Sequence, residues 1–256
     1  MTQSHESLVE TQFGARADAY LTSPVHAQGP DLTVLEALVK AHAGGRVLDM
    51  GCGGGHVSFH AAPHAREVVA YDLSSQMLAV VVDAARGRGL SNITTCQGPA
   101  EQVPFEDAAF DMVLSRYSTH HWRDFPRGLR EAARVLKPGG MAVFIDVVAA
   151  GTPMCDTFFQ AIELLRDPSH VRDYSRAEWE TALAQTRLIV QATRRFRLRL
   201  DFASWVKRMQ TSQVQIDAIR ALQKAVSADV TAYFETEVDG SFTIDVALFE
   251  ARKCSL

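Results

Sequence analysis

The sequence has few cysteines and no paired arrangement of them. The four are widely spaced and form no Cys-x-x-Cys motif; they are Cys52, Cys96, Cys155 and Cys254. This spacing gives no zinc-finger pattern and fits a reduced, cytoplasmic protein.

Long hydrophobic runs and an excess of positive charge are also missing. The most apolar runs, Met77–Val82 and Met141–Ala150, are too short to span a membrane, and residues 1–20 have no apolar signal core. The net charge of −4 argues against a nucleic-acid partner, which usually binds a basic protein. We therefore expect a protein without a membrane span that does not bind nucleic acid.

What the sequence does contain is a regular alternation of strand-like and helix-like segments between residues 31 and 150. Such alternation predicts a parallel sheet with helices on both faces. After Ala150 the rhythm changes: residues 152–186 and 201–235 look helical, while 189–200 and 241–252 look like strands. We expect one domain over 1–256, with an N-terminal segment (1–30), a core (31–150) and helical additions with the final strands (151–256).

The stretch VLDMGCGGGHVSFHAA, residues 47–62, places a glycine-rich turn after the first predicted strand. In open sheets of this kind, ligands bind at the carboxyl ends of the strands. A dinucleotide site requires G-x-G-x-x-G, and counting from Gly51 the third glycine is replaced by His56. A nicotinamide-dependent oxidoreductase is therefore the less favoured interpretation.

Four segments in order resemble the motifs of class I S-adenosylmethionine-dependent methyltransferases, in particular the ubiquinone/menaquinone-biosynthesis C-methyltransferase group. They are VLDMGCGGG (47–55), VVAYDLSSQML (68–78), GPAEQVPFEDAAFDMVLSRYSTHHW (98–122) and REAARVLKPGGMAVFIDV (130–147). FGARADAYLTSPVHAQG (13–29) resembles the entry helix of that group, and DPSHVRDYS (167–175) is similar to a segment of unassigned role in some close relatives. The resemblance covers residues 13–147 well and the rest thinly.

The resemblance implies a Rossmann-like class I methyltransferase fold, a mostly parallel seven-stranded sheet with helical additions after strand five, and S-adenosylmethionine as cofactor. In the family the glycine backbone lies against the methionine and ribose parts of the cofactor. The acid at the end of the second strand, here Asp72, binds the ribose hydroxyls, which suits a carboxylate acceptor. The implied cofactor-binding residues are Asp49, Gly51, Gly53, Gly55, Asp72, Leu73, Ala100, Glu101, Arg116 and Tyr20.

One position departs from the family pattern at the adenine end of the cofactor. Relatives often have an aspartate before the Ala-Glu pair, and Pro99 stands there in this sequence. Proline has no side-chain acceptor and no N–H. We expect the backbone at Ala100, apolar packing and Glu101 to hold adenine instead.

His120 and His121 follow the fourth predicted strand, where the methyl group would arrive. Histidine titrates near neutral pH, so either residue is a candidate base. The alternative is a packed loop in which Trp122 is the apolar anchor. His56, His60 and His64 are spaced by four, but no cysteine or carboxylate completes a metal set, so a solvated face is favoured and no metal is expected.

The segments after residue 150 carry apolar stripes where related enzymes build their acceptor pocket. Phe202, Trp205, Val206 and Met209 fall on one helical face. With Tyr20 and His26 in an N-terminal lid, we expect a cleft for a small, largely apolar methyl acceptor. The residues SRYS stand after the fourth predicted strand in place of a DPPY-type motif. Methylation of nucleobase amines is therefore disfavoured. A non-catalytic cofactor-binding or regulatory protein is the alternative.

The alternating arginines in residues 194–200 have two interpretations, one functional and one structural. Arg195, Arg197 and Arg199 alternate with apolar residues. The pattern is consistent with a basic patch for an acidic substrate, but it is more typical of an exposed edge strand whose charges block aggregation.

Overall fold

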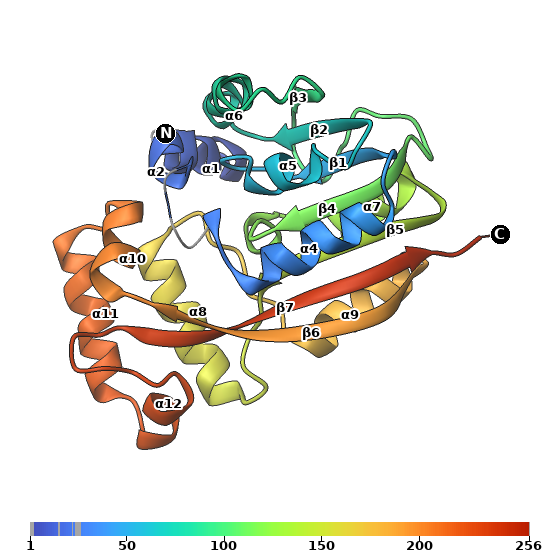
Figure 1. Ribbon diagram of the computed structural model, residues 1–256. Helices are drawn as coiled ribbons and strands as arrows, with labels where there is room; N and C mark the ends of the chain where they lie inside the picture. The colour runs from blue at the N-terminus through green and yellow to red at the C-terminus, as the bar shows by residue number, and fades with distance from the viewer. Residues whose placement is uncertain (1–2, 15, 22, 24–26, 256) are drawn as a thin grey trace.

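A computed structural model describes residues 3–14, 16–21, 23 and 27–255, and these form a seven-stranded sheet (Figure 1). The strands are β1 (Arg46–Met50), β2 (Glu67–Asp72), β3 (Ile93–Gln97), β4 (Phe110–Arg116), β5 (Leu136–Val147), β6 (Leu188–Leu200) and β7 (Phe242–Lys253). Their order is β3-β2-β1-β4-β5-β7-β6, and β7 pairs antiparallel with both of its neighbours. The other pairings are parallel, which confirms the predicted fold class.

Helices cover both faces of the sheet because its central strands are apolar on both sides. Alternate residues of β1 show this: Leu48 and Met50 join one core cluster, while Val47 joins the other. One face is covered by α4 (Pro30–Ala41), α5 (His56–Ala61) and α6 (Ser75–Gly87), and the other by α7 (Phe125–Val135) and α9 (Arg176–Gln185).

A second group of helices packs around the far ends of β6 and β7 (Figure 1). It comprises α8 (Pro153–Arg166), α10 (Phe202–Met209), α11 (Gln213–Ala225) and α12 (Ala228–Tyr233). Trp205 of α10 packs edge-on to Phe242 of β7, with ring centroids 5.0 Å apart. The predicted stripe on α10 is buried in this cluster, whereas Leu164 on α8 points to solvent.

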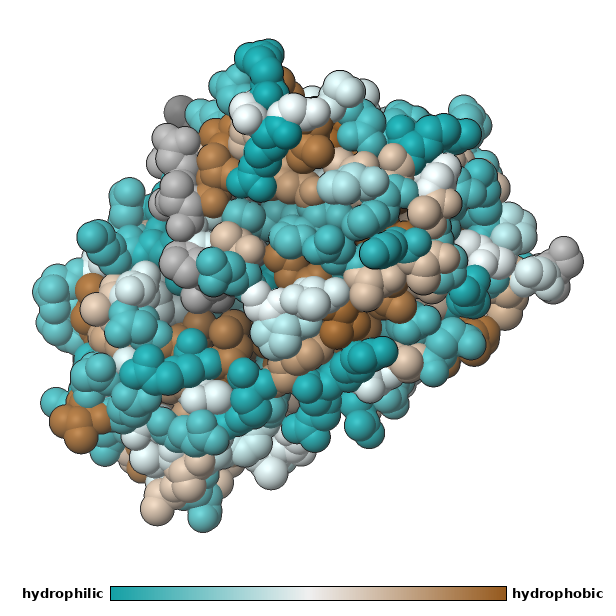
Figure 2. Space-filling model, viewed as in Figure 1, coloured by the Kyte–Doolittle hydropathy of each residue, from teal (hydrophilic) through white to brown (hydrophobic). Residues whose placement is uncertain are grey.

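The arginine-rich segment is the edge strand of the sheet, as predicted. Arg197 pairs with Asp245 of the neighbouring strand at 3.3 Å, and Arg199 pairs with Glu237 at 2.5 Å. Figure 2 shows that hydrophilic residues predominate on the visible face of the molecule, with apolar ones in scattered patches.

Three element boundaries have local causes or differ from the sequence expectation. The N-terminal segment forms two helices, α1 (His5–Gly14) and α2 (Ala17–Leu21). Helix α7 ends at Val135, and residues 137–140 belong to β5, since Pro138 cannot continue a helix. The helical stretch expected over 152–186 is interrupted between α8 and α9.

Trp179 of α9 should be a major contributor to the stability of this core. Its side chain is fully buried, stacks on Phe249 of β7 at 4.9 Å and meets Phe125 of α7 edge-on at 4.6 Å. We expect Trp179→Ala to lower the free energy of unfolding by about 3–5 kcal/mol, measured by chemical denaturation. Val238→Ala is the control: Val238 is 98% exposed, and its change should stay within about 0.5 kcal/mol. Equal effects of the two variants would contradict this assignment.

Candidate functional site

A cavity of about 1040 Å³, counted out to its mouth, lies at the carboxyl ends of β1, β2 and β4. Most of the predicted cofactor-binding residues line it: Gly51, Gly53, Asp72, Leu73, Ala100, Glu101, Arg116 and Tyr20. His121 lines it too, whereas His120, Asp49 and Gly55 do not.

The glycines of the turn serve three different purposes. A Cβ at Gly51 would collide with the hydroxyl of Ser118, and one at Gly54 would lie 3.1–3.2 Å from the backbone of Tyr20 and Leu21. These two glycines let other parts of the chain approach. Gly53 has φ +49° and a Cβ there would meet nothing within 4 Å, so the turn leaves open space on the cavity side.

Gly55 has a packing role instead of the predicted contact with the cofactor. It precedes α5 in a left-handed conformation, with φ +83°. A Cβ at this position would lie 2.8 Å from the Phe59 ring and 2.9 Å from Val81. The glycine is therefore explained by helix packing below the cavity.

Asp72 is held at the cavity wall by two backbone amides. Gly53 donates to Oδ2 at 2.8 Å, and Ser74 donates to Oδ1 at 2.9 Å. Burial raises the pKa of Asp72, and the two amides oppose that rise. Each carboxylate oxygen retains acceptor capacity, as a vicinal diol requires.

Asp49, one of the implied cofactor-binding residues, does not line the cavity and lies at the end of β1 beneath the turn. Its side chain is fully buried, and Ser58 donates to Oδ2 at 2.6 Å. Burial raises the pKa of Asp49 to about 7. Its Oδ1 has no hydrogen-bond partner within the described part of the chain.

The turn around Pro99 is fixed by its backbone carbonyls. The Tyr71 hydroxyl donates to the carbonyl of Pro99 at 2.9 Å. Glu101 is buried, and its carboxylate accepts from the amide of Asp124 at 3.0 Å, where α7 begins. The carboxylate is thus engaged in holding α7, and both Ala100 and Glu101 line the cavity.

Arg116 joins the cavity floor to α4. Its Nε donates to Asp31 at 2.6 Å, and both side chains are almost completely buried. The guanidinium also lies over the Tyr117 ring, 4.3 Å from the centroid. Breaking such a buried pair leaves an uncompensated charge, so Arg116 has a structural constraint besides its place at the cavity.

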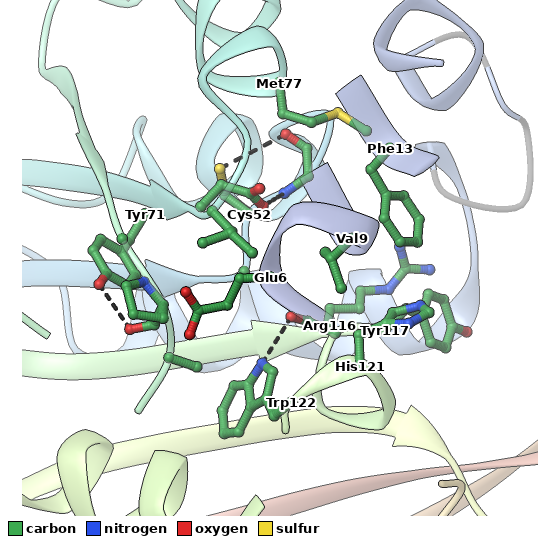
Figure 3. Close-up of a pocket in the computed structure, with 18 of the residues that line it drawn as sticks. Glu6, Val9, Phe13, Cys52, Tyr71, Met77, Arg116, Tyr117, His121 and Trp122 are labelled. Atoms are coloured by element: carbon green, nitrogen blue, oxygen red, sulfur yellow. Dashed lines mark hydrogen bonds between the residues drawn. The ribbon is translucent and has the colours of Figure 1, made fainter. Parts of the chain in front are cut away.

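The N-terminal helices form part of the wall of the cavity. Figure 3 shows Glu6, Val9 and Phe13 from α1 among the lining residues, with Arg116, Tyr117 and His121 nearby. The carbonyl of Tyr20 lies 3.1 Å from His56 Nε2. The three α1 residues were not predicted from the sequence, although Val9 and Phe13 have a helical spacing of four. His26 lies outside the described residues.

Three histidines gather beside the cavity, and two were predicted. His120 donates through Nδ1 to Asp146 at 2.6 Å, and its ring lies 4.2 Å from that of His121 and 5.9 Å from that of His170. His170 and Asp173 come from the 167–175 segment, whose resemblance to a segment of unassigned role was the available signal. No pattern in the sequence indicated a role for Asp146.

Burial and neighbouring charges give the three rings different protonation states. Burial opposes the charge on His120, but Asp146 outweighs it and raises the pKa to about 9. Burial and the charge on His120 lower the pKa of His121 to about 4 and that of His170 to about 2. At neutral pH, His120 is therefore an imidazolium, whereas His121 and His170 are neutral.

The His56, His60 and His64 series forms no metal site in the described part of the chain, where no group of three or more ligand side chains gathers. His60 and His64 both lie against Glu36 of α4, at 2.6 and 3.4 Å. The expected solvated face is wrong for His56, which is buried because α2 covers it.

Residues 48–144 match a family model described as a methyltransferase domain. The chain is 48% identical over 201 residues to the protein YafE of Escherichia coli (strain K12), which covers 78% of this chain and 97% of that one. It is 36% identical over 199 residues to the methyltransferase YcgJ of Bacillus subtilis (strain 168), covering 78% and 79% of the two chains. The crystal structure of YcgJ superposes with a TM-score of 0.84 at 31% identity, over 88% of this chain and 98% of that one.

The chain belongs to the class I S-adenosylmethionine-dependent methyltransferases. A shorter match, 37% identical over 112 residues, is to the ubiquinone/menaquinone biosynthesis C-methyltransferase UbiE of Geobacter sulfurreducens, covering 42% of this chain and 44% of that one. The predicted resemblance is thereby confirmed. The cofactor of this methyltransferase is S-adenosylmethionine. None of its described helices is long and apolar enough to cross a membrane.

Gly53 provides a direct test of the cofactor site in this methyltransferase. We expect Gly53→Leu to abolish S-adenosylhomocysteine binding in calorimetry, because the side chain would fill the open space. Gly44→Leu is the matched control: Gly44 also has a positive φ and open surroundings, but it lies at the amino end of β1. Both variants should lose about 1–2 kcal/mol of stability from strain, and only the first should lose binding. Retained binding in Gly53→Leu would rule out this placement.

The His120–Asp146 pair predicts a specific dependence of stability on pH. Because folding raises the pKa of His120 from 6.5 to about 9, its contribution is complete below pH 6.5 and disappears as pH rises through 9. His120→Gln should therefore cost about 3 kcal/mol more at pH 6.5 than at pH 9.5, measured by urea denaturation.

The same substitution in an Asp146→Asn background is the control for this pH dependence of stability. There His120→Gln should show little pH dependence, because the charge that raises the pKa is gone. A cost of His120→Gln that is constant from pH 6.5 to 9.5 in the otherwise wild-type protein would contradict the assigned protonation state.

Proposed function

We propose that this methyltransferase acts on a small molecule that binds in a second cavity beside the cofactor site. The observation that carries the proposal is the position of this cavity, of about 580 Å³ out to its mouth. Phe13, Tyr20, Tyr117 and His121 line both cavities. A molecule in the second cavity therefore lies next to the cofactor, under the same N-terminal helices.

The residues of the first cavity suit the separate parts of S-adenosylmethionine. The proposed contacts are the Gly53 backbone for the methionine and ribose parts, Asp72 for the ribose hydroxyls and the Ala100 backbone for adenine. The bound cofactor supplies a methyl group on a positively charged sulfur, which is already a reactive electrophile. The contribution of the protein is then alignment of the two reactants and exclusion of water by α1 and α2.

The protonation states argue against a general base with a pKa near 7. His120 is already protonated at neutral pH, and the pKa of His121 is about 4, far below the optimum for a base. The His121 Nδ1 donates to the carbonyl of Ser169 at 3.2 Å, so its lone pair is on Nε2. We propose that these histidines orient the acceptor and that the acceptor arrives as a nucleophile without transfer of a proton to them.

The walls of the second cavity suggest an acceptor with an apolar body. Apolar side chains come from β5, β6, β7 and α10: Val147, Leu198, Leu200, Trp205 and Ile244. Charged side chains from α8, α10 and the 167–175 segment share the walls: Glu163, Arg166, Asp173 and Arg208. The largely apolar cleft expected from the sequence thus describes only one side of the cavity.

A labelling experiment tests the proposed class of substrate. The protein is incubated with methyl-labelled S-adenosylmethionine and a bacterial cell extract, which is then separated into small-molecule, protein and nucleic-acid fractions. We expect label in the small-molecule fraction with wild type and none with Gly53→Leu. A panel of quinols, phenols and fatty acids, analysed by mass spectrometry, then narrows the acceptor. Label found only in protein or nucleic acid would overturn the proposal.

A further inference from the structure

The second cavity is lined by a cation, Arg208, that has no counter-ion among the described residues. Arg208 lies in the last turn of α10, half-buried and lining the cavity. Within the described ranges, no carboxylate lies within ion-pair distance of it and no hydrogen bond is formed. Burial lowers the pKa of Arg208 and the nearby Arg166 lowers it further, whereas Tyr20 and Glu163 partly oppose this shift.

The other two positive charges among the residues that line this cavity are already paired. Arg166 pairs with Glu163 at 3.2 Å and donates to the carbonyl of Trp205 at 3.1 Å. His120 pairs with Asp146. Arg208 therefore leaves one positive charge unmatched, and arginine cannot lose its proton to relieve it.

His120 adds a hydrogen-bond donor to this wall. The Nδ1–H of its imidazolium donates to Asp146, and the second N–H, at Nε2, remains available in a residue that lines the cavity. Asp173 is buried, and its Oδ2 has no hydrogen-bond partner in the described part of the chain. Burial raises the pKa of Asp173 well above its usual range, and the charge on His120 opposes that rise.

We propose that the second cavity binds a monocarboxylate with an apolar body, its carboxylate held by Arg208 and the Nε2–H of His120 and its body against β6 and β7. One unmatched positive charge fits one negative charge, and a planar guanidinium fits a carboxylate. The apolar wall of Leu198, Leu200 and Ile244 lies in the same cavity and covers the rest of the molecule. This inference rests on the proposed function, because it names the class of acceptor for that site.

Binding of a matched pair of probes tests the charge requirement. Octanoate and octanamide have nearly the same shape and differ in charge, and each is titrated by calorimetry into protein saturated with S-adenosylhomocysteine. We expect octanoate to bind at least about tenfold more tightly than octanamide, as a charge-assisted hydrogen bond provides. Equal affinity, or no octanoate binding at millimolar concentration, overturns the proposal. Octyl phosphate is a third probe: if it binds and octanoate does not, the carboxylate assignment is wrong.

Substitutions on α10 test whether Arg208 is the residue that binds the carboxylate. Arg208→Gln should weaken octanoate binding by about ten- to hundredfold and remove the preference over octanamide, and Arg208→Lys should retain part of it. Lys207→Gln is the control, because Lys207 is the exposed neighbouring cation outside the cavity. Octanoate affinity unchanged in Arg208→Gln overturns the proposal.

Measurement of cofactor binding distinguishes failure of this inference from failure of the proposed function. Arg208 does not line the first cavity, so Arg208→Gln should bind S-adenosylhomocysteine like wild type. Intact cofactor binding and small-molecule methylation, with no preference for a carboxylate, would contradict only the monocarboxylate site. Label transferred only to macromolecules would contradict the proposed function itself.

Discussion

The site depends on the hydrogen bond between the Gly53 amide and the Asp72 carboxylate, 2.8 Å long. It joins the turns that follow β1 and β2, which lie side by side because these strands pair in parallel from Arg46 to Met50. The bond fixes a carboxylate beside a stretch of backbone that has no side chain over it. This makes one surface that can accept hydroxyl groups and contact a ligand closely.

A second constraint, the buried pair of His120 and Asp146, sets the electrostatics of the neighbouring cavity. Burial, together with the positive charge that Asp146 holds on His120, keeps the two adjacent histidines neutral. One carboxylate on β5 thus influences the protonation of histidines that come from two other segments.

The sequence predicted the features that depend on local backbone chemistry. Strand and helix alternation, the glycine turn and the acid at the end of β2 are all visible over a few residues. The arrangement around His120 depends on segments 26 to 50 residues apart, 119–121, 146 and 170–173, and no local pattern brings these together. The unmatched charge of Arg208 was equally hidden, because a helix with arginine in its last turn is ordinary until its surroundings are known.

The N-terminal helices connect the two cavities physically. The backbone of Tyr20 and Leu21 lies against Gly54 of the turn, and the carbonyl of Tyr20 lies 3.1 Å from His56 Nε2. The hydroxyl of the same tyrosine donates to Met209 of α10 at 3.1 Å, one residue after Arg208. A single aromatic residue therefore spans from the cofactor turn to the helix that carries the unmatched cation. Because Tyr20 lines both cavities, a change in the position of α2 would alter the walls of both.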